Sequence, residues 1–257
     1  MAVIIVLTNQ KGGVGKTTSS AALAGGLVQK GFRVLAIDMD PQGNLGFSLG
    51  LSQEEGDIYE VLSGAKSIRE AICKTEECDV IPSGMMLSSM QTNIDAEHMQ
   101  TVLKDRLKEV QEEYDYIVID TPPALNLLTV NAYAAASYLV IPMGADILSL
   151  VGLAQLRETV EAVRNQINPQ LKVLGILLTR FNARTRLSRD VLDMAGEVAA
   201  QLDTKVFSHT IRNAVAVSEA PAHGESIVKY AKGSRVSEDY EGFVAEVLSR
   251  LQAGKQS

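Results

Sequence analysis

The feature that most constrains the fold is a glycine-rich turn between a short apolar segment and a helix-forming segment. The turn, residues 11–18, reads KGGVGKTT, and residues 2–8 before it read AVIIVLT. Such a short, β-branched apolar run predicts a strand that is buried on both faces. Residues 16–30 carry apolar side chains at helical spacing and end at Gly31, a common helix terminator. A strand, a glycine-rich loop and a helix in this order predict one unit of a parallel α/β sheet.

The rest of the chain alternates strand-length apolar runs with helix-length stretches. Further strands are predicted at residues 33–37, 79–82, 116–119, 138–141, 173–178 and 206–209. Residues 38–50 are predicted to form a loop, and residues 54–110 are predicted to be mostly helical. The individual helices are predicted at residues 96–113, 125–136, 147–167, 187–202 and 237–251. Strands separated by helices imply right-handed crossovers, so we predict a doubly wound, mostly parallel α/β sheet with helices on both faces. No repeat or linker divides the chain, and we expect residues 1–257 to form a single domain.

Composition narrows the class of protein further. The chain has 24 basic and 31 acidic side chains and a net charge of −7, so any contact with nucleic acid must come from a local basic patch. Its apolar runs are far shorter than the roughly 18 residues that a membrane span needs. Cys73 and Cys78 cannot form a disulfide framework, and no nearby histidine completes a metal site with them. These features predict a cytoplasmic globular protein.

The glycine-rich loop has the composition of a phosphate-binding site. Its three glycines let backbone N–H groups converge on phosphate oxygens, and the N-terminus of the following helix adds a favourable dipole. Lys16 is expected to pair with the β- and γ-phosphates of ATP, and the Thr17 hydroxyl to bind Mg²⁺. The residues predicted to bind the nucleotide here are Lys11, Gly12, Gly13, Val14, Gly15, Lys16, Thr17 and Thr18. The alternative is a flexible loop without a ligand, which the strand–loop–helix order disfavours.

Carboxylates follow two other predicted strands. Asp38 and Asp40 lie in the sequence DMDPQGN after the second strand, and Asp120 ends the apolar run YIVID. Ligands of parallel sheets collect at the carboxyl ends of the strands, so these side chains are expected to face the loop. Carboxylates there can serve the waters of Mg²⁺ and the attacking water. A turn with solvated carboxylates is the alternative for Asp38 and Asp40.

With these motifs in view, the chain resembles the deviant Walker A ATPases and, within them, the ParA/Soj family of DNA-partition proteins. The loop departs from the standard phosphate-loop pattern, because Gln10 stands where that pattern has glycine and Lys11 adds a second lysine. The resemblance covers almost the whole chain and continues through DMDPQGN and YDYIVIDTPPALNLLTVNA to TRFNARTRLSRDV and IRNAVAVSEAPAHGESI.

The resemblance implies a role for each motif. It implies that Lys11 reaches across a nucleotide-sandwich dimer to the phosphates of the partner, and that hydrolysis depends on Asp40. The implied catalytic residues are Lys11, Lys16 and Asp40. The implied Mg²⁺ residues are Thr17, Asp38 and Asp120, and the implied contacts to the nucleotide base are Arg212 and Asn213.

The resemblance also implies partners. An ATP-dependent homodimer would bind double-stranded DNA without sequence preference, associate with the nucleoid and be released by hydrolysis that a ParB-like protein stimulates. The chain begins at the first predicted strand, without the helix-turn-helix extension of larger plasmid partition ATPases. We therefore expect no sequence-specific operator binding by this chain alone.

A cluster of arginines is the candidate DNA-binding surface. Residues 179–190 hold no acidic side chain before Asp190 and contain four arginines, Arg180, Arg184, Arg186 and Arg189. Arginine pairs well with phosphate oxygens, and such contacts give affinity without sequence preference. The resemblance places a DNA-contacting arginine at Arg184, whereas a solvated protein face is the alternative. A second basic cluster, at Lys229, Lys232 and Arg235, is a candidate extension of this surface.

Two other function classes share the loop. A MinD-like membrane ATPase needs a basic amphipathic C-terminal helix, but the tail from Val236 has four acidic and two basic side chains. A nitrogenase-like iron protein needs two separated cysteines in later loops, whereas both cysteines precede residue 80. The sequence therefore favours the partition ATPase, with no stable membrane association.

Overall fold

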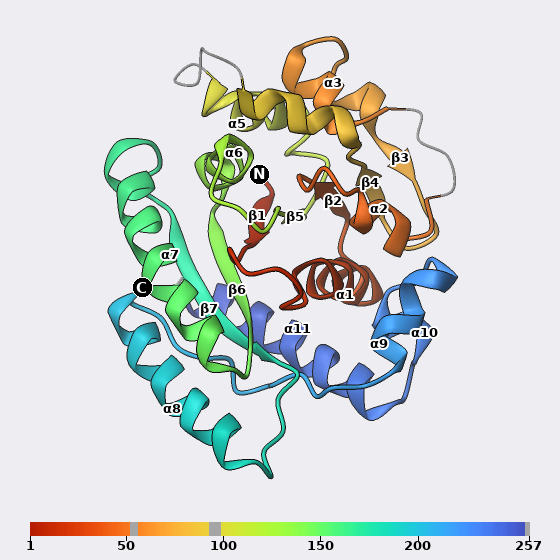
Figure 1. Ribbon diagram of the computed structural model, residues 1–257. Helices are drawn as coiled ribbons and strands as arrows, with labels where there is room; N and C mark the ends of the chain where they lie inside the picture. Colours follow the sequence, from red (N-terminus) through yellow and green to blue (C-terminus); the bar gives the residue numbers. More distant parts are fainter. Residues whose placement is uncertain (52–55, 93–98, 255–257) are drawn as a thin grey trace.

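A central β-sheet organises the computed structural model, which describes residues 1–51, 56–92 and 99–254. Among these residues, seven strands pair in the order β3-β4-β2-β5-β1-β6-β7 (Figure 1). The strands are β1 (Val3–Leu7), β2 (Val34–Asp38), β3 (Cys73–Lys74), β4 (Asp79–Ile81), β5 (Tyr116–Asp120), β6 (Tyr138–Gly144) and β7 (Lys172–Thr179). All neighbouring pairs are parallel except β3 with β4 at one edge. The predicted doubly wound, mostly parallel α/β sheet is confirmed.

Helices cover both faces of this sheet and bury two hydrophobic cores. On one face lie α1 (Lys16–Gln29), α2 (Asn44–Ser48), α9 (Ala216–Glu219), the 3-10 turn Ala220–His223, α10 (Ile227–Tyr230) and α11 (Arg235–Ala253). On the other lie α3 (Ile58–Ser63), the 3-10 turns Arg69–Ala71 and Met85–Thr92, α5 (Val102–Leu107), α6 (Leu127–Ala135), α7 (Ile147–Gln166) and α8 (Arg186–Gln201). Within the described ranges no helix is both long and apolar enough to cross a membrane.

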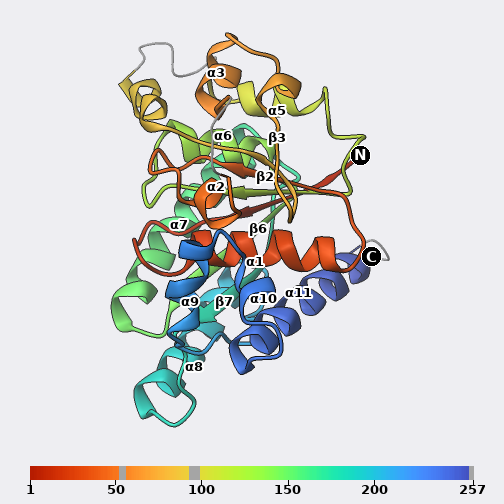
Figure 2. The same ribbon diagram turned by 90° about the vertical axis from the view of Figure 1, so that its right-hand side faces the viewer.

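The strand register brings distant parts of the sequence together at the carboxyl ends of the strands. Asp120 at the end of β5 is level with Leu7 of β1 on one side and with Asp38 of β2 on the other. The loop between β1 and α1 therefore lies beside the ends of β2 and β5. Figure 2 shows this loop at one end of the molecule, and the amino terminus and the last turn of α11 at the other.

The strand predicted at residues 206–209 is wrong. Val206 makes only an isolated bridge to Ile176 of β7. Around this bridge, the N–H of Ile176 donates to the Lys205 carbonyl at 3.3 Å and the N–H of Phe207 to the Ile176 carbonyl at 2.8 Å. Further bonds go to α11, because the Arg250 guanidinium donates to the Val206 carbonyl at 2.9 Å and Glu246 accepts the backbone N–H of Ser208 at 3.0 Å. These two side chains of α11 bond backbone groups that would pair with a neighbouring strand if the segment formed a longer strand.

Other predictions held only in outline. The loop predicted at residues 38–50 contains the short helix α2. The helix predicted at 96–113 is α5, which ends at Leu107 because later N–H groups, such as that of Val110, bond three residues back as in turns. Residues 96–98 of that prediction lie outside the described residues. The short helices α9 and α10 were not predicted, since each has only four residues.

A matched pair of glycines tests the packing of α1 against α11. A Cβ at Gly26 would lie 2.8 Å from Cγ2 of the buried Val244, whereas one at Gly196 on α8 would meet nothing within 4 Å. We expect Gly26→Ala to lower the free energy of unfolding by about 1–2 kcal/mol, despite the higher helix propensity of alanine. Gly196→Ala should raise it by about 0.5–1 kcal/mol. Urea unfolding measures both, and a stabilised Gly26→Ala would contradict this packing.

Candidate functional site

The glycine-rich loop has a backbone that only glycine adopts easily. Gly13 and Gly15 have φ of 71° and 82°, in the left-handed region. Thr179 at the end of β7 holds the loop against the sheet. Its buried hydroxyl lies within hydrogen-bonding distance of the carbonyls of Val14 in the loop (2.9 Å) and Met143 in β6 (3.1 Å). The loop is thus held at the carboxyl ends of β6 and β7 with its conformation fixed by residues far away in sequence.

Lys16, the first residue of α1, is buried under this loop with 6% of its surface exposed. Within the described ranges its ammonium makes one hydrogen bond, to the Lys11 carbonyl at 3.3 Å. Burial lowers the pKa of Lys16, and the charges of Asp120 and Asp40 offset part of that effect. An ammonium has three donors, so two remain for an anion in the loop.

The side chains of Thr17 and Ser20 both point to Asp120. Thr17 Oγ1 donates to Oδ2 at 2.6 Å and Ser20 Oγ to Oδ1 at 2.9 Å, so both oxygens of this buried carboxylate are bonded. Burial raises the pKa of Asp120 to about 6, although these hydroxyls act in the opposite direction. The first turn of α1 and the end of β5 therefore form one hydrogen-bonded unit.

Asp38 is the second buried carboxylate at this edge. Its oxygens accept the backbone N–H groups of Asp40 at 2.9 Å and Leu45 at 2.8 Å. Burial raises its pKa well above the ordinary value, and the neighbouring Asp120 adds to the shift. Asp40 is partly exposed in the turn that follows, where it accepts the N–H of Gln42 at 3.1 Å.

The oxygen atoms of these residues fit a hard divalent cation whose coordination is completed by a bound ligand. The oxygens of Thr17, Asp38 and Asp120 are the donor type that Mg²⁺ prefers. The raised pKa of both carboxylates means that their charged forms are disfavoured in the protein, and a bound cation would stabilise those charged forms. The described residues contain no group of three or more His, Cys, Asp or Glu able to hold a metal ion. Mg²⁺ usually keeps waters and takes phosphate oxygens to complete its shell, so the donor set suits a nucleotide-bound ion.

Lys11 contacts residues that the sequence did not single out. Its ammonium donates to Asp146 Oδ1 at 2.6 Å and to Ser149 Oγ at 3.3 Å. Asp146 is also the N-cap of α7, since it accepts the backbone N–H of Ser149 at 3.0 Å. Partial burial raises the pKa of Asp146, but the bonds from Lys11 and Ser149 outweigh it and hold that pKa below its ordinary value. The sequence around Asp146 indicates only an N-cap of a helix, and nothing in it indicates the contact with Lys11.

A cavity of about 420 Å³ opens beside the loop and holds the residues predicted to contact a base. Arg212 and Asn213 line it together with Thr18 and Arg180. The Arg212 guanidinium is fixed by two bonds to Asp239, at 2.6 and 2.7 Å. The cavity is adjacent to the phosphate loop, because Gly15 and Thr18 also line it.

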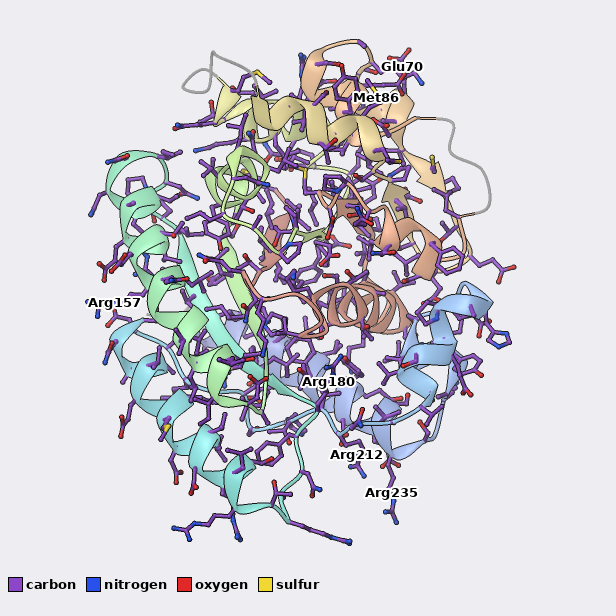
Figure 3. The ribbon with its side chains drawn as sticks, in the orientation of Figure 1. Glu70, Met86, Arg157, Arg180, Arg212 and Arg235 are labelled. Atoms are coloured by element: carbon purple, nitrogen blue, oxygen red, sulfur yellow. The ribbon has the colours of Figure 1, made fainter. Side chains whose placement is uncertain are left out.

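The structure separates Arg180 from the other members of the predicted arginine cluster. Arg180 lines the cavity beside Gly13, and Figure 3 shows it between the loop and Arg212. Arg184, Arg186 and Arg189 are exposed at the start of α8, away from the loop. The predicted surface therefore consists of three arginines. In the second basic cluster, Lys229 pairs with Glu76 and Glu225, which leaves less free charge there.

The paired carboxylates predict a pH-dependent stability. Because the folded pKa of Asp120 is raised, the folded state binds more protons than the unfolded state, and the free energy of unfolding falls as pH rises through about 4 to 6. We expect Asp120→Asn to reduce this fall by on the order of 2 kcal/mol in urea unfolding without nucleotide or Mg²⁺. An unchanged pH profile would contradict the assignment.

Comparison with known proteins places this geometry in a family. The sequence model of the AAA domain family matches residues 2–173. The chromosome partitioning protein ParA of Myxococcus xanthus is 39% identical over 252 residues, which cover 96% of this chain and 88% of that protein. The sporulation initiation inhibitor protein Soj of Bacillus subtilis is 40% identical over 97% of this chain and 99% of its own.

Solved structures agree with the sequence relatives. Apo McdA of Cyanothece superposes with a TM-score of 0.86 at 28% identity, covering 96% of this chain and all (100%) of that one. A Mycobacterium smegmatis protein named cobyrinic acid a,c-diamide synthase, solved with ADP and magnesium, gives 0.84 at 30% identity, covering 99% of this chain and 97% of that one. The chain therefore belongs to the AAA domain family and, within it, to the ParA/Soj family of partitioning ATPases.

Proposed function

We propose that the protein is an ATP- and Mg²⁺-dependent switch in DNA partition, active as a homodimer on DNA. The observation that carries this proposal is the meeting of the buried Lys16, the Thr17 hydroxyl and two buried carboxylates under a glycine-rich loop. The relatives named as partitioning proteins support the biological setting. A plasmid partition protein of Borrelia burgdorferi solved with AMPPNP, at 28% identity and a TM-score of 0.79 over 97% of this chain and 98% of that one, supports the nucleotide.

ATP would bind along the first turn of α1. The backbone of residues 12–18 and the Lys16 ammonium would hold the β- and γ-phosphates, with the base in the cavity near Arg212 and Asn213. Thr17, Asp38 and Asp120 would hold Mg²⁺, which when bound neutralises phosphate charge. Asp40 is partly exposed, and only one of its carboxylate oxygens accepts a hydrogen bond from the described residues, so the other would orient the attacking water.

Dimerisation would require Lys11 to leave Asp146. In the single chain this ion pair satisfies Lys11, whereas in a sandwich dimer the ammonium would turn to phosphates bound by the partner subunit. Exposed apolar side chains near Asp146 support an interface with a partner subunit here, since Leu148 and Val151 are 72% and 60% exposed. Loss of the γ-phosphate on hydrolysis would return Lys11 to Asp146 and open the dimer.

DNA would bind to Arg184, Arg186 and Arg189. On a chain with a net charge of −7 they form a local basic patch, and a symmetric dimer would double it. A ParB-like partner would stimulate hydrolysis and release the protein from the nucleoid. We propose that all these steps occur in one domain of residues 1–257, without stable membrane association.

Two substitutions should separate binding from hydrolysis. Lys16→Ala removes the buried cation that faces the β- and γ-phosphates, so we expect loss of ATP binding in a filter or fluorescence assay. Asp40→Ala should bind ATP and dimerise as the wild type does but turn over more slowly, by roughly 10²-fold or more. Normal ATP affinity in Lys16→Ala, or wild-type turnover in Asp40→Ala, would refute the respective role.

The Lys11–Asp146 pair gives opposite predictions for its two members. Lys11→Gln should bind nucleotide but remain monomeric with a nonhydrolysable ATP analogue. Asp146→Asn keeps an oxygen to cap α7 but drops the charge, so it should dimerise at lower analogue concentration than the wild type. Light scattering across an analogue titration measures both. A dimer of Lys11→Gln, or an unchanged Asp146→Asn titration, counts against this exchange.

DNA binding should depend on ATP and on the exposed arginines. We expect the wild type to co-sediment with duplex DNA in ATP but not in ADP or without nucleotide. Doubling the phosphate contacts in a dimer should also steepen the loss of affinity with salt, at about −0.9 per contact in log–log terms. Arg184→Glu should lose binding at about 0.1 M salt, whereas the matched charge reversal Lys104→Glu on α5 should keep it. Equal binding with and without ATP would refute the switch.

A further inference from the structure

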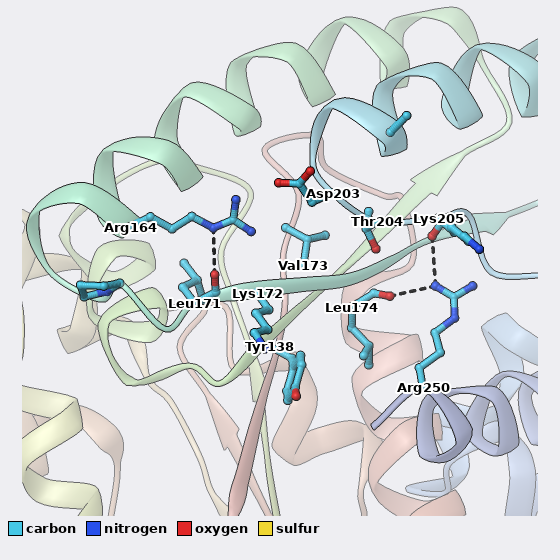
Figure 4. A pocket seen from close by; sticks show the side chains of 12 residues that line it. Tyr138, Arg164, Leu171, Lys172, Val173, Leu174, Asp203, Thr204, Lys205 and Arg250 are labelled. Atoms are coloured by element: carbon cyan, nitrogen blue, oxygen red, sulfur yellow. Dashed lines mark hydrogen bonds between the residues drawn. The ribbon is translucent and has the colours of Figure 1, made fainter. Parts of the chain in front are cut away.

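We propose that a basic pocket at the amino-terminal ends of β6 and β7 binds an acidic peptide segment of a partner protein. The pocket has a volume of about 720 Å³ and lies among β7, the ends of α7 and α8, and α11 (Figure 4). Its charged lining residues are Arg164, Lys172, Asp203, Lys205 and Arg250. None of them belongs to the candidate nucleotide site.

The charges of this pocket are unbalanced. Arg164, Lys172 and Lys205 face one carboxylate, that of Asp203, because the fourth cation, Arg250, is paired with Glu246. The chain as a whole carries a net charge of −7. Lys172 and Lys205 are exposed, and neither forms an ion pair with a described residue. Arg164 donates Nε to the backbone carbonyl of Leu171 at 2.8 Å, a bond that leaves its charge uncompensated. The pocket is therefore a local region of positive potential that attracts an anion.

Arg250 builds one wall of the pocket rather than supplying free charge. It pairs with Glu246 at 2.6 Å and also donates to the carbonyls of Leu174 at 2.8 Å and Lys205 at 3.1 Å. Its guanidinium lies 4.0 Å from the centroid of the Phe207 ring. These contacts hold the start of β7 and the segment of Lys205 together, so the pocket is formed before any ligand arrives.

The spacing of the cations favours an extended ligand over a single small anion. Arg164 is bonded at Leu171, and Lys205 lies level with Gly175 of β7, since Val206 bridges to Ile176. These two positions of β7 are four residues apart, which corresponds to roughly 13 Å along an extended chain. Lys172 projects from the same stretch, as Figure 4 shows. One phosphate or carboxylate cannot reach both ends. In an extended peptide, side chains on one face repeat about every 7 Å, so two or three carboxylates can engage this row.

The apolar lining favours a peptide over DNA. Between the cations the pocket is lined by Pro169, Val173 and Leu174 and by the ring of Tyr138. An apolar side chain between two acidic ones would bury surface there, whereas a DNA backbone has no such group. The pocket also lies about seven residues of β7, roughly 23 Å, from Thr179 at the nucleotide loop. Binding there should not require ATP.

The direct test uses a fluorescein-labelled peptide, Glu-Glu-Leu-Glu-Glu, and the full chain in fluorescence anisotropy, with Gln-Gln-Leu-Gln-Gln as the neutral probe. We expect binding of the acidic probe only, with or without ATP. The double variant Lys172→Gln/Lys205→Gln should weaken it about tenfold. The matched double variant Lys30→Gln/Lys104→Gln, which removes the same charge elsewhere, should bind like the wild type. Equal ATP hydrolysis in both variants shows that both are folded.

The single carboxylate gives a test in the opposite direction. Asp203 has φ 54°, in the left-handed region that asparagine also tolerates, so Asp203→Asn removes the charge without backbone strain. It should raise the affinity for the acidic probe about two- to fivefold. The proposal is overturned if the wild type does not bind the acidic probe, or if the two double variants weaken it equally. It is also overturned if inorganic phosphate or duplex DNA displaces the probe more effectively than the unlabelled peptide does.

Discussion

Two buried carboxylates at the same register of neighbouring strands are the constraint on which the rest of the site depends. Asp38 and Asp120 pair across β2 and β5 and have no solvent exposure, and the charge of the buried Lys16 acts on Asp120. Two such charges repel each other, and the one buried ammonium cannot neutralise both. The single chain therefore holds an excess of negative charge, which a divalent cation carried by a nucleotide would remove. Ligand binding and local stability are coupled through this pair.

The nucleotide edge could be predicted because its residues are adjacent in sequence to the strands and helix that position them. KGGVGKTT begins four residues after the end of β1, and Asp38 and Asp120 are the last residues of their strands. In a parallel sheet such positions lie on the same side of the sheet, at the carboxyl ends of the strands, where ligands bind. The strand order itself, with β5 between β1 and β2, had no local signal.

The features that escaped prediction depend on contacts between distant residues. Asp146 lies 135 residues from Lys11, and its sequence context marks it only as a helix cap. Residues 206–209 have the composition of a strand, but beyond one bridge to β7 the side chains of Glu246 and Arg250 on α11 take the hydrogen bonds that a longer ladder would use. Arg180 belongs to the arginine cluster in sequence, yet the turn after β7 carries it to the cavity. In each case a side chain from another element decides the outcome.

β7 and α8 both run between the basic pocket and the other end of the molecule. β7 begins in the basic pocket at Lys172 and ends under the phosphate loop at Thr179, while α8 begins at the exposed arginines and ends beside the pocket at Ala200. A strand and a helix this well packed move as rigid bodies, so a peptide in the pocket would leave the loop geometry unchanged. Such a peptide would set where the protein is held, while ATP alone would set when it binds DNA.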